Sequence, residues 1–284
     1  MQQVSVSSEG DPDVSDGAGV DLDGTYEVSD EQVAAFEADG YIRLPGVLSP
    51  ETVEAFAPAI TDGVITLNTQ HLPMAERSTY QKAFLQVTNL WTHDETVRQF
   101  VFSRRLAEVV ARLLGVKSVR LYHDQALYKE DGGGITPWHA DQYYWPISSD
   151  RSVTVWVPLQ PTPLDMGPLE FAKGSHHLEV GREMEISGES ERAIQQSLVR
   201  AGYPTDQAAY DLGDVSFHRG WTFHRAGANR SGRPRKVMTV IYVDADITVT
   251  EPTNQNQIKD MNSWMPGTAA GQVPATPLNP VLFP

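Results

Sequence analysis

The first part of the chain places apolar residues at helical spacing. The sequence Ser-Asp-Glu-Gln at 29–32 is a capping box, which predicts a short helix that begins there, runs through Phe36 and ends at Gly40. A strand is expected at 41–44, before a Pro-Gly turn. Residues 61–93 are polar and irregular and give no clear prediction. Helical spacing returns in two further segments, which begin at Ser49–Pro50 and at Asp94. The second segment has a cap at Ser103 in its middle and ends at Gly115.

From residue 116 onward the pattern changes to short strands. Alternation is plainest in the segment 152–159, where Val153, Val155 and Val157 would share one face of a sheet. Clusters of Gly, Pro and Asp separate the apolar runs, as turns do. The other expected strands are 116–128, 169–172, 214–218 and 236–243.

The organisation predicted from this pattern is one folded domain over 29–284, preceded by a flexible acidic tail over 1–28. The tail is rich in Ser, Asp and Gly and has too few apolar residues to offset the entropy of ordering. An inserted helix is expected at 189–202, and the C-terminal segment, rich in Pro and Asn, is expected to wrap the surface. Helices followed by many short strands predict a mainly β fold, a barrel or sandwich with flanking helices.

Composition narrows the possible chemistry. The 284 residues include 22 Lys and Arg against 37 Asp and Glu, a net charge of −15. Such a field repels phosphate backbones and anionic membranes, so neither nucleic acid nor a membrane is an expected partner. With no cysteine, disulfides, thiolate nucleophiles and iron–sulfur sites are excluded, and any metal must be held by His, carboxylates or water. Lacking a spanning apolar run or a signal peptide, the sequence favours a cytoplasmic location.

Two separate segments carry residues suited to a metal. His139 and Asp141 form a His-x-Asp pair, and residues two apart on a strand point to the same side. His224 follows a strand and turn far along the chain, and Arg235 opens the next strand. Two imidazoles and one carboxylate are the ligands of the facial triad that binds non-haem Fe(II) and leaves one face open. A fixed guanidinium nearby suits the carboxylate of a bound cosubstrate.

Simpler explanations exist for each of these residues. His139 and Asp141 alone could form a surface ion pair, His224 could be a core histidine, and Arg235 could be an ordinary charge at a strand end. Other histidines compete for the metal, namely His176, His177 and His218. The Gly-Ser-His sequence that holds the first of these is typical of a structural turn.

In four stretches the sequence resembles the phytanoyl-CoA dioxygenase family of Fe(II)/2-oxoglutarate oxygenases, in the family's order and at roughly its spacings. The stretches are Phe-Glu-Ala-Asp-Gly-Tyr at 36–41, His-Ala-Asp at 139–141, Gly-Ser-His at 174–176, and the segment from Gly-Asp at 213–214 to Arg235. The resemblance implies a double-stranded β-helix, a jelly-roll or cupin-like barrel, with Fe(II), 2-oxoglutarate and O₂ as the reacting partners.

The resemblance also implies roles for particular residues. His139, Asp141 and His224 match the family's metal ligands, and Arg235 matches the partner of the 2-oxoglutarate C5 carboxylate. Two further positions match residues near the cosubstrate in relatives, Gln125 and Trp156. One departure is Ala226, because many relatives carry Ser or Thr there and use the hydroxyl to hold the C5 carboxylate. We expect the missing hydroxyl to weaken binding of 2-oxoglutarate by one hydrogen bond, which is about 1 kcal/mol.

The expected reaction is hydroxylation of an unactivated C–H bond in a small organic molecule, with release of succinate and CO₂. The carboxylate of Asp141 favours hydroxylation, since halogenating relatives replace it with a small residue. Desaturation, cyclisation or epimerisation at the same centre, or a non-oxidative metal-binding cupin-like protein, are the alternatives. Substrate and oligomeric state stay open. The candidate substrate-pocket residues are Tyr143, Tyr144, Trp145, Trp221 and His123.

Overall fold

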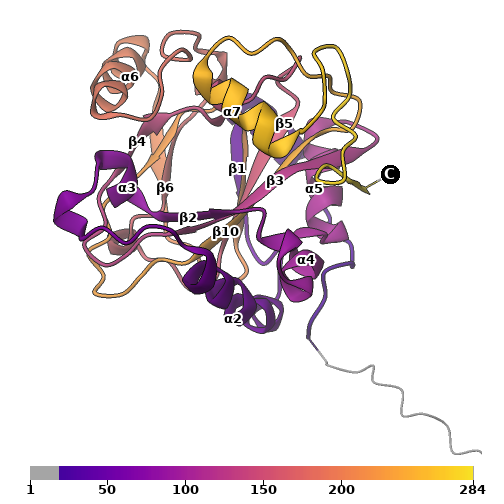
Figure 1. The fold of residues 1–284 in the computed structure, drawn as a ribbon, viewed down its shortest axis with the longest axis horizontal. Coiled ribbons are helices and arrows are strands. Elements are labelled where there is room, and N and C mark those ends of the chain that lie inside the picture. The colour runs from indigo at the N-terminus through magenta and orange to yellow at the C-terminus, as the bar shows by residue number, and fades with distance from the viewer. Residues whose placement is uncertain (1–18, 284) are drawn as a thin grey trace, which may run out of the picture.

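The computed structural model describes residues 19–283, which form two antiparallel sheets with flanking helices (Figure 1). The larger sheet has the strand order β1-β8-β5-β10-β3-β11, and β2 pairs with β3 beside this path. Every pairing in it is antiparallel. Its strands are β1 (Tyr41–Leu44), β2 (Leu85–Thr88), β3 (Val119–Tyr128), β5 (Ser152–Pro158), β8 (Val215–Arg219), β10 (Val237–Asp244) and β11 (Val281–Phe283).

The smaller sheet has the order β4-β9-β6-β7 and carries two of the candidate metal ligands, His139 and His224. Within it, His139 lies opposite His224 and Thr136 lies opposite Ala226 across the β4–β9 pair. Directly opposite residues of an antiparallel pair project to the same face, so the two side chains of each pair lie on the same side of the sheet. The strands are β4 (Thr136–His139), β6 (Leu169–Ala172), β7 (Thr205–Gln207) and β9 (His224–Ala226).

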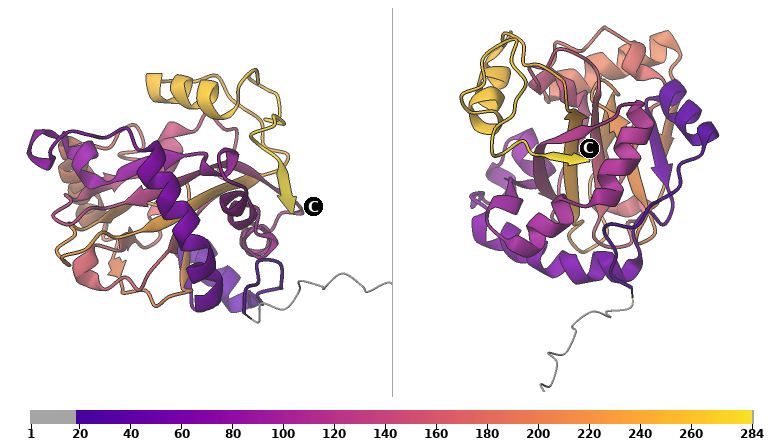
Figure 2. Two further views of the ribbon diagram at one scale, coloured as in Figure 1. Left: turned by 60° about the horizontal axis from the view of Figure 1, so that its bottom comes forward. Right: turned by 90° about the vertical axis from the view of Figure 1, so that its right-hand side faces the viewer.

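Helices from the N-terminal part pack on one face of the larger sheet and close the main apolar core. Figure 1 shows α2 and α4 on the opposite side of the strands from α7, and Figure 2 shows α7 and the chain after it along the outside of the strands. No helix within 19–283 combines the length and hydrophobicity needed to span a bilayer. The α-helices are α1 (Asp30–Asp39), α2 (Pro50–Leu67), α3 (Thr79–Ala83), α4 (Glu95–Val101), α5 (Arg104–Leu114), α6 (Gly188–Ala201) and α7 (Gln255–Trp264), and the short 3₁₀ helices are η1 (Met74–Glu76), η2 (Leu90–Thr92), η3 (Asp141–Tyr144), η4 (Leu164–Met166) and η5 (Ser175–His177).

Strand β5 shows how the sequence alternation separates core from cavity. Val153, Val155 and Val157 are fully buried in the core beneath the helices. The residues between them, Thr154 and Trp156, line a cavity on the other face of the strand. Burying an aliphatic side chain of this size contributes about 1.5–3 kcal/mol, so one face of the strand stabilises the fold while the other carries functional groups.

The predicted helix ends are confirmed. Ser29 caps α1 through the reciprocal bonds of a capping box, and Gly40, at φ 77°, ends it. Ser103 caps α5, and Gly115 ends it at φ 65°. Left-handed backbone of this kind favours glycine, which has no Cβ to clash. The predicted strands and the helix expected at 189–202 are also present, with ends that differ by a few residues.

Two parts of the chain hold elements that were not predicted, and one expectation needs correction. Residues 61–93, which gave no prediction, contain the end of α2, all of α3 and all of β2. The C-terminal segment includes the helix α7, which was not predicted. Residues 19–28 of the expected flexible tail are held against the domain: Asp21 pairs with Arg105, and Ser103 donates a 2.9 Å hydrogen bond to the Leu22 carbonyl. The rest of that prediction, 1–18, lies outside the described residues.

Candidate active site

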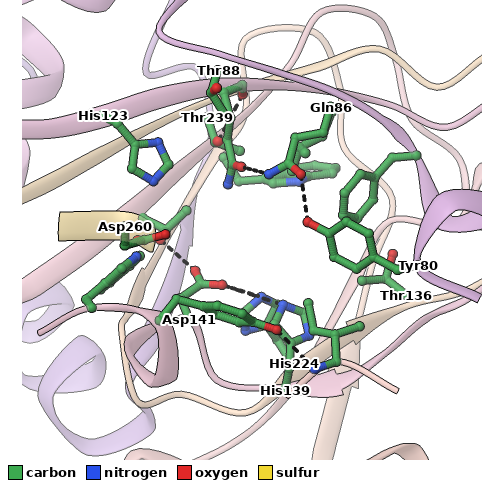
Figure 3. Close-up of a pocket in the computed structure, with 18 of the residues that line it drawn as sticks. Tyr80, Gln86, Thr88, His123, Thr136, His139, Asp141, His224, Thr239 and Asp260 are labelled. Atoms are coloured by element: carbon green, nitrogen blue, oxygen red, sulfur yellow. Dashed lines mark hydrogen bonds and ion pairs between the residues drawn. The ribbon is translucent and has the colours of Figure 1, made fainter. Parts of the chain in front are cut away.

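A cavity of about 610 Å³ lies between the two sheets. The larger sheet contributes residues such as Gln125 and Trp156, and the smaller sheet contributes His139 and His224. Figure 3 shows His139, Asp141 and His224 gathered on one side, with Gln86, Thr88 and Thr239 across the space from them. Groups from both sheets therefore face one cavity.

We call His139, Asp141 and His224 the triad. His139 ends β4, Asp141 follows at the start of η3, and His224 begins β9. The Asp141 Oδ1 atom lies 3.5 Å from His139 Nε2 and 3.7 Å from His224 Nε2. One ligand atom from each residue lies within 4.8 Å of the others, a spacing that can hold one metal ion. The convergence expected from the sequence is thus present.

Hydrogen bonds orient both imidazoles toward the shared point. The Nδ1 of His139 lies 2.7 Å from the Pro137 carbonyl oxygen, and the Nδ1 of His224 lies 3.0 Å from the Thr222 carbonyl oxygen. A carbonyl only accepts, so each Nδ1 carries the hydrogen and each Nε2 presents its lone pair. This is the way in which metal-binding histidines are commonly fixed. The donor set therefore fits a divalent ion such as Fe(II).

Asp141 is held through its other oxygen. Its Oδ2 accepts hydrogen bonds from Thr154 Oγ1 at 2.7 Å and from His218 Nε2 at 3.1 Å, which leaves Oδ1 facing the triad imidazoles. Burial opposes the charge of Asp141, but the surrounding imidazoles, His224 first among them, hold its pKa well below its usual value. Burial and the neighbouring imidazoles also hold the pKa of His224 well below its usual value. A charged carboxylate and a neutral imidazole are the forms that bind metal.

The competing histidines occupy other positions. His218, on β8, contacts Asp141 from outside the triad and so positions this carboxylate. His176 and His177 lie in η5, where their rings pack against each other with centroids 3.9 Å apart. Neither lines the cavity as the structure describes it.

A second wall of the cavity, which we call the arginine wall, consists of Thr136, Trp156, Ala226 and Arg235. Arg235 lies just before β10, is almost fully buried, and places its guanidinium carbon 5.4 Å from the centre of the Trp156 ring. Its Nη1 donates to the Gly167 carbonyl, while its Nε has no acceptor in the described part of the chain. A buried cation with an unused donor beside a cavity fits the carboxylate of a dicarboxylic cosubstrate. Gln125 also lines the cavity, where its side-chain oxygen accepts a hydrogen bond from Gln86.

The expected substrate-pocket residues divide into two groups. His123, Tyr144 and Trp145 line the cavity. Tyr143 and Trp221 instead line a separate pocket. Tyr143 lies outside the cavity although Tyr144 lines it, because η3 turns the chain at this point. The two consecutive tyrosines project in different directions, with their rings perpendicular.

Other lining residues were missed from the sequence. We use the name outer wall for five cavity residues outside the triad and the arginine wall: Tyr80, Gln86, Trp145, Asp260 and Trp264. Only Trp145 was expected. Tyr80 and Gln86 belong to the polar stretch that gave no prediction, and the other two belong to α7. The Asn254 side chain caps α7, a local signal that could have revealed the helix.

Comparison with known proteins adds independent evidence. The model of the phytanoyl-CoA dioxygenase (PhyH) family matches residues 36–237, which include the whole triad and Arg235. A probable alpha-ketoglutarate-dependent hypophosphite dioxygenase from Stutzerimonas stutzeri is 24% identical over 226 residues, covering 76% of this chain and 79% of the relative. A 1-deoxypentalenic acid 11-beta-hydroxylase from Streptomyces exfoliatus is 25% identical over 225 residues, covering 70% and 74%.

Solved structures agree with the sequence matches. The non-haem alpha-ketoglutarate-dependent carbocyclase SnoK from nogalamycin biosynthesis superposes with a TM-score of 0.75 at 25% identity, covering 91% of this chain and 99% of that one. The epimerase SnoN, in complex with Fe³⁺ and alpha-ketoglutarate, gives a TM-score of 0.72 at 26% identity, covering 88% and 96%. With its fold, its triad and more than half of its length matched, the chain belongs to the phytanoyl-CoA dioxygenase family of Fe(II)/2-oxoglutarate-dependent oxygenases.

Proposed function

We propose that this enzyme hydroxylates an unactivated C–H bond of a small organic molecule and converts 2-oxoglutarate to succinate and CO₂. The observation that carries the proposal is that the triad and the buried Arg235 face the same cavity. This pairs a site for a metal with a site for an anion. Neither a simple core histidine nor a surface ion pair requires such an arrangement.

Each group has a definite role in this proposal. His139, Asp141 and His224 hold Fe(II), and Arg235 holds the C5 carboxylate of 2-oxoglutarate while Trp156 packs beside it. Gln125, on the larger sheet, contacts the same cosubstrate. When bound, Fe(II), 2-oxoglutarate and O₂ supply the oxidising power, and the protein supplies orientation and shelter from water.

The architecture that we propose for this chemistry is a double-stranded β-helix in a single catalytic domain. The two antiparallel sheets with a cavity between them support this architecture. The positions of the triad residues on β4, η3 and β9 support it as well. In this arrangement the smaller sheet fixes the ligands and the larger sheet closes the back of the cavity.

The substrate is expected to lie against the outer wall. Trp145 and Trp264 offer flat apolar surfaces there, and Gln86 and Asp260 offer polar groups. Such a mixture suits a ring-sized molecule that carries a few hydrogen-bonding groups. His123 and Tyr144 add to the same surroundings.

Ring closure and epimerisation are the second candidate outcome. The solved structures that match this chain include a carbocyclase and an epimerase, both alpha-ketoglutarate dependent. The same metal and cosubstrate residues would serve, because these outcomes differ only in the fate of the substrate after a hydrogen has been removed from it. Analysis of the product distinguishes them: hydroxylation adds one oxygen to the substrate, whereas cyclisation and epimerisation add none.

Formation of succinate tests the proposal. Purified protein is incubated in air with Fe(II), ascorbate and 2-oxoglutarate, alone and with fractions of a metabolite extract, and succinate is measured. We expect slow release without substrate and faster release with the fraction that contains it. If the protein neither binds 2-oxoglutarate nor releases succinate with any fraction, the oxygenase assignment is wrong.

Arg235→Ala tests the role of the anion site. Removing a buried charge-assisted contact is expected to weaken 2-oxoglutarate binding about 100-fold. Arg230→Ala is the matched control, because Arg230 is a nearby but exposed arginine, and it should leave binding unchanged. A metal-binding protein that does not use 2-oxoglutarate would instead retain its function in Arg235→Ala.

A further inference from the structure

Two hydrogen-bond acceptors lie in the part of the cavity next to α7. His123 on β3 and Asp260 on α7 both line the cavity, and Figure 3 shows them on the same side of it. Trp264 lies close to both. It follows Asp260 by one helical turn, which places the two on one face of α7, and its ring centroid is 5.0 Å from that of His123. The three side chains therefore border one region of the cavity.

His123 presents a lone pair to this region. The residue is 5% exposed, and its Nδ1 lies 3.2 Å from the Asp124 carbonyl oxygen. A carbonyl only accepts, so Nδ1 carries the hydrogen and Nε2 carries the lone pair. Burial lowers the pKa of His123 to about 4, which keeps the ring neutral at neutral pH. Within residues 19–283 no group donates to Nε2, so this buried acceptor is available to a donor on a bound molecule.

Asp260 presents a carboxylate oxygen to the same region. The Tyr122 hydroxyl donates a 3.3 Å hydrogen bond to its Oδ2, and Oδ1 has no donor in the described part of the chain. Among the same residues, no Lys, Arg or His nitrogen lies within 4.0 Å of this carboxylate. The neighbouring Lys259 is exposed. A half-buried carboxylate without a cation beside it favours a positively charged ligand.

The aromatic surroundings also suit a cation. Trp145 and Trp264 both line the cavity, and the Trp145 ring packs against Tyr122, the residue that bonds Asp260, with centroids 5.5 Å apart. The faces of indole rings attract cations. The net charge of −15 draws cations toward the protein as a whole. A neutral alcohol could donate to one acceptor, but it would leave the carboxylate without a counter-charge, whereas an ammonium supplies the charge and several N–H donors.

We propose that the substrate carries an ammonium group, which donates hydrogen bonds to the Asp260 carboxylate and to His123 Nε2 and lies between the indoles of Trp145 and Trp264. The inference rests on the proposed function, because it names the class of molecule that the oxygenase acts on. Burial raises the pKa of Asp260 to about 7, and a cation bound beside it favours the charged form. The ammonium thus anchors one end of the substrate to β3 and α7, away from the triad.

Two probes of similar size test the ammonium site. The protein, loaded with Fe(II) and 2-oxoglutarate and kept free of O₂, is titrated at neutral pH with benzylammonium and with benzyl methyl ether, and tryptophan fluorescence is followed. The ether has neither a charge nor an N–H or O–H donor. We expect the wild type to bind benzylammonium about 10-fold more tightly than the ether, as for hydrogen bonds to a charged group.

Variants assign this preference to particular residues. Asp260→Asn and His123→Phe should each weaken benzylammonium binding about 10-fold and change ether binding less than about twofold. Asp260→Glu should keep most of the preference, because it keeps the charge. The matched control is Asp246→Asn, which removes one negative charge at an exposed position outside the cavity lining and should have no effect. Thermal unfolding of each variant shows whether it is folded.

The natural substrate provides a second test. The fraction of a metabolite extract that speeds succinate release should be retained by a cation exchanger at neutral pH. Acetylation of the amines in that fraction removes their charge and should abolish its effect. A stimulating fraction that passes through the exchanger, or that keeps its effect after acetylation, would contradict the inference.

The outcomes separate this inference from the proposed function. If the wild type binds 2-oxoglutarate and releases succinate but does not prefer benzylammonium to the ether, the inference is wrong and the function stands. A preference that persists in Asp260→Asn, or that Asp246→Asn reduces equally, also overturns it, because binding to the metal or net charge would then explain the preference. If the protein neither binds 2-oxoglutarate nor releases succinate, the function is wrong, and a preference that depends on Asp260 would still support the ammonium site.

Discussion

The triad and the outer wall face the same cavity but are built in different ways. Each triad residue lies in or directly after a strand of the smaller sheet, and hydrogen bonds to its neighbours fix its orientation. The outer wall instead comes from separate segments, α3, β2, the residue after η3, and α7. The comparison teaches that two of the three triad residues are fixed by one strand pair, whereas the outer wall gathers residues from segments that lie far apart in the sequence. Loss of metal and loss of substrate should therefore be separable by mutation.

Asp141→Ala should have the largest effect. It removes the only carboxylate of the triad, and its Oδ1 atom lies close to both triad imidazoles. We expect loss of tight Fe(II) binding and a fall in succinate release of about 1,000-fold or more. Direct Fe(II) binding and the succinate assay measure the two effects. If this variant released succinate as fast as the wild type, the triad would have no role in the mechanism.

Thr154→Val should weaken the triad without removing a ligand. The Thr154 hydroxyl donates a 2.7 Å hydrogen bond to Asp141 Oδ2, and valine keeps its shape. Loss of such an orienting bond typically costs about 10- to 100-fold in metal affinity. The matched control is Thr239→Val, because Thr239 also lines the cavity but bonds the Gln125 backbone carbonyl. Equal Fe(II) affinities in both variants and the wild type would show that Asp141 needs no such support.

The triad could be predicted from the sequence, whereas most of the outer wall could not. His139 and His224 could be paired because strand periodicity and a shared motif order fix where their side chains meet. The same holds for Val153 and its alternate neighbours, whose burial was predicted from the period of two. Arg235 was found because it opens an apolar strand and a matching motif precedes it.

The other lining residues could not be predicted from local pattern. Gln86 reaches the cavity because β2 pairs with β3, a contact between residues that are distant in sequence, and Tyr80 lies in the helix just before β2, where its hydroxyl donates to Gln86. Asp260 and Trp264 reach it because α7 packs near η3, a contact between segments that lie far apart in the sequence and that no local pattern specifies. Tyr143 and Trp221 were assigned to the substrate pocket from their nearness in sequence to the triad, which does not fix where a side chain points in a turn.

Trp264→Ala should affect the substrate and spare the metal. The indole forms part of the outer wall and packs against His123, with ring centroids 5.0 Å apart and the ring planes tilted by 34°. Removing an aromatic surface should raise KM for the substrate about 10-fold. Ile258→Ala on the same helix is the control, since Ile258 is exposed and lies outside the cavity lining. A comparable loss of Fe(II) affinity in Trp264→Ala would show that the two walls are not independent.

Asp260→Asn should have the smallest effect, on stability. Burial raises the pKa of Asp260 to about 7, above the value of about 4 for an unfolded carboxyl. The folded state then holds this proton more tightly, so its contribution to stability is full below about pH 4 and is lost as the pH rises through 7. Asparagine does not titrate, so the stability of the variant relative to the wild type should be greater at pH 8 than at pH 4. Chemical denaturation of both proteins at the two pH values measures this difference. An equal pH dependence for variant and wild type would place the Asp260 carboxylate in water, and the outer wall would then present a charge to the substrate at every pH above 4.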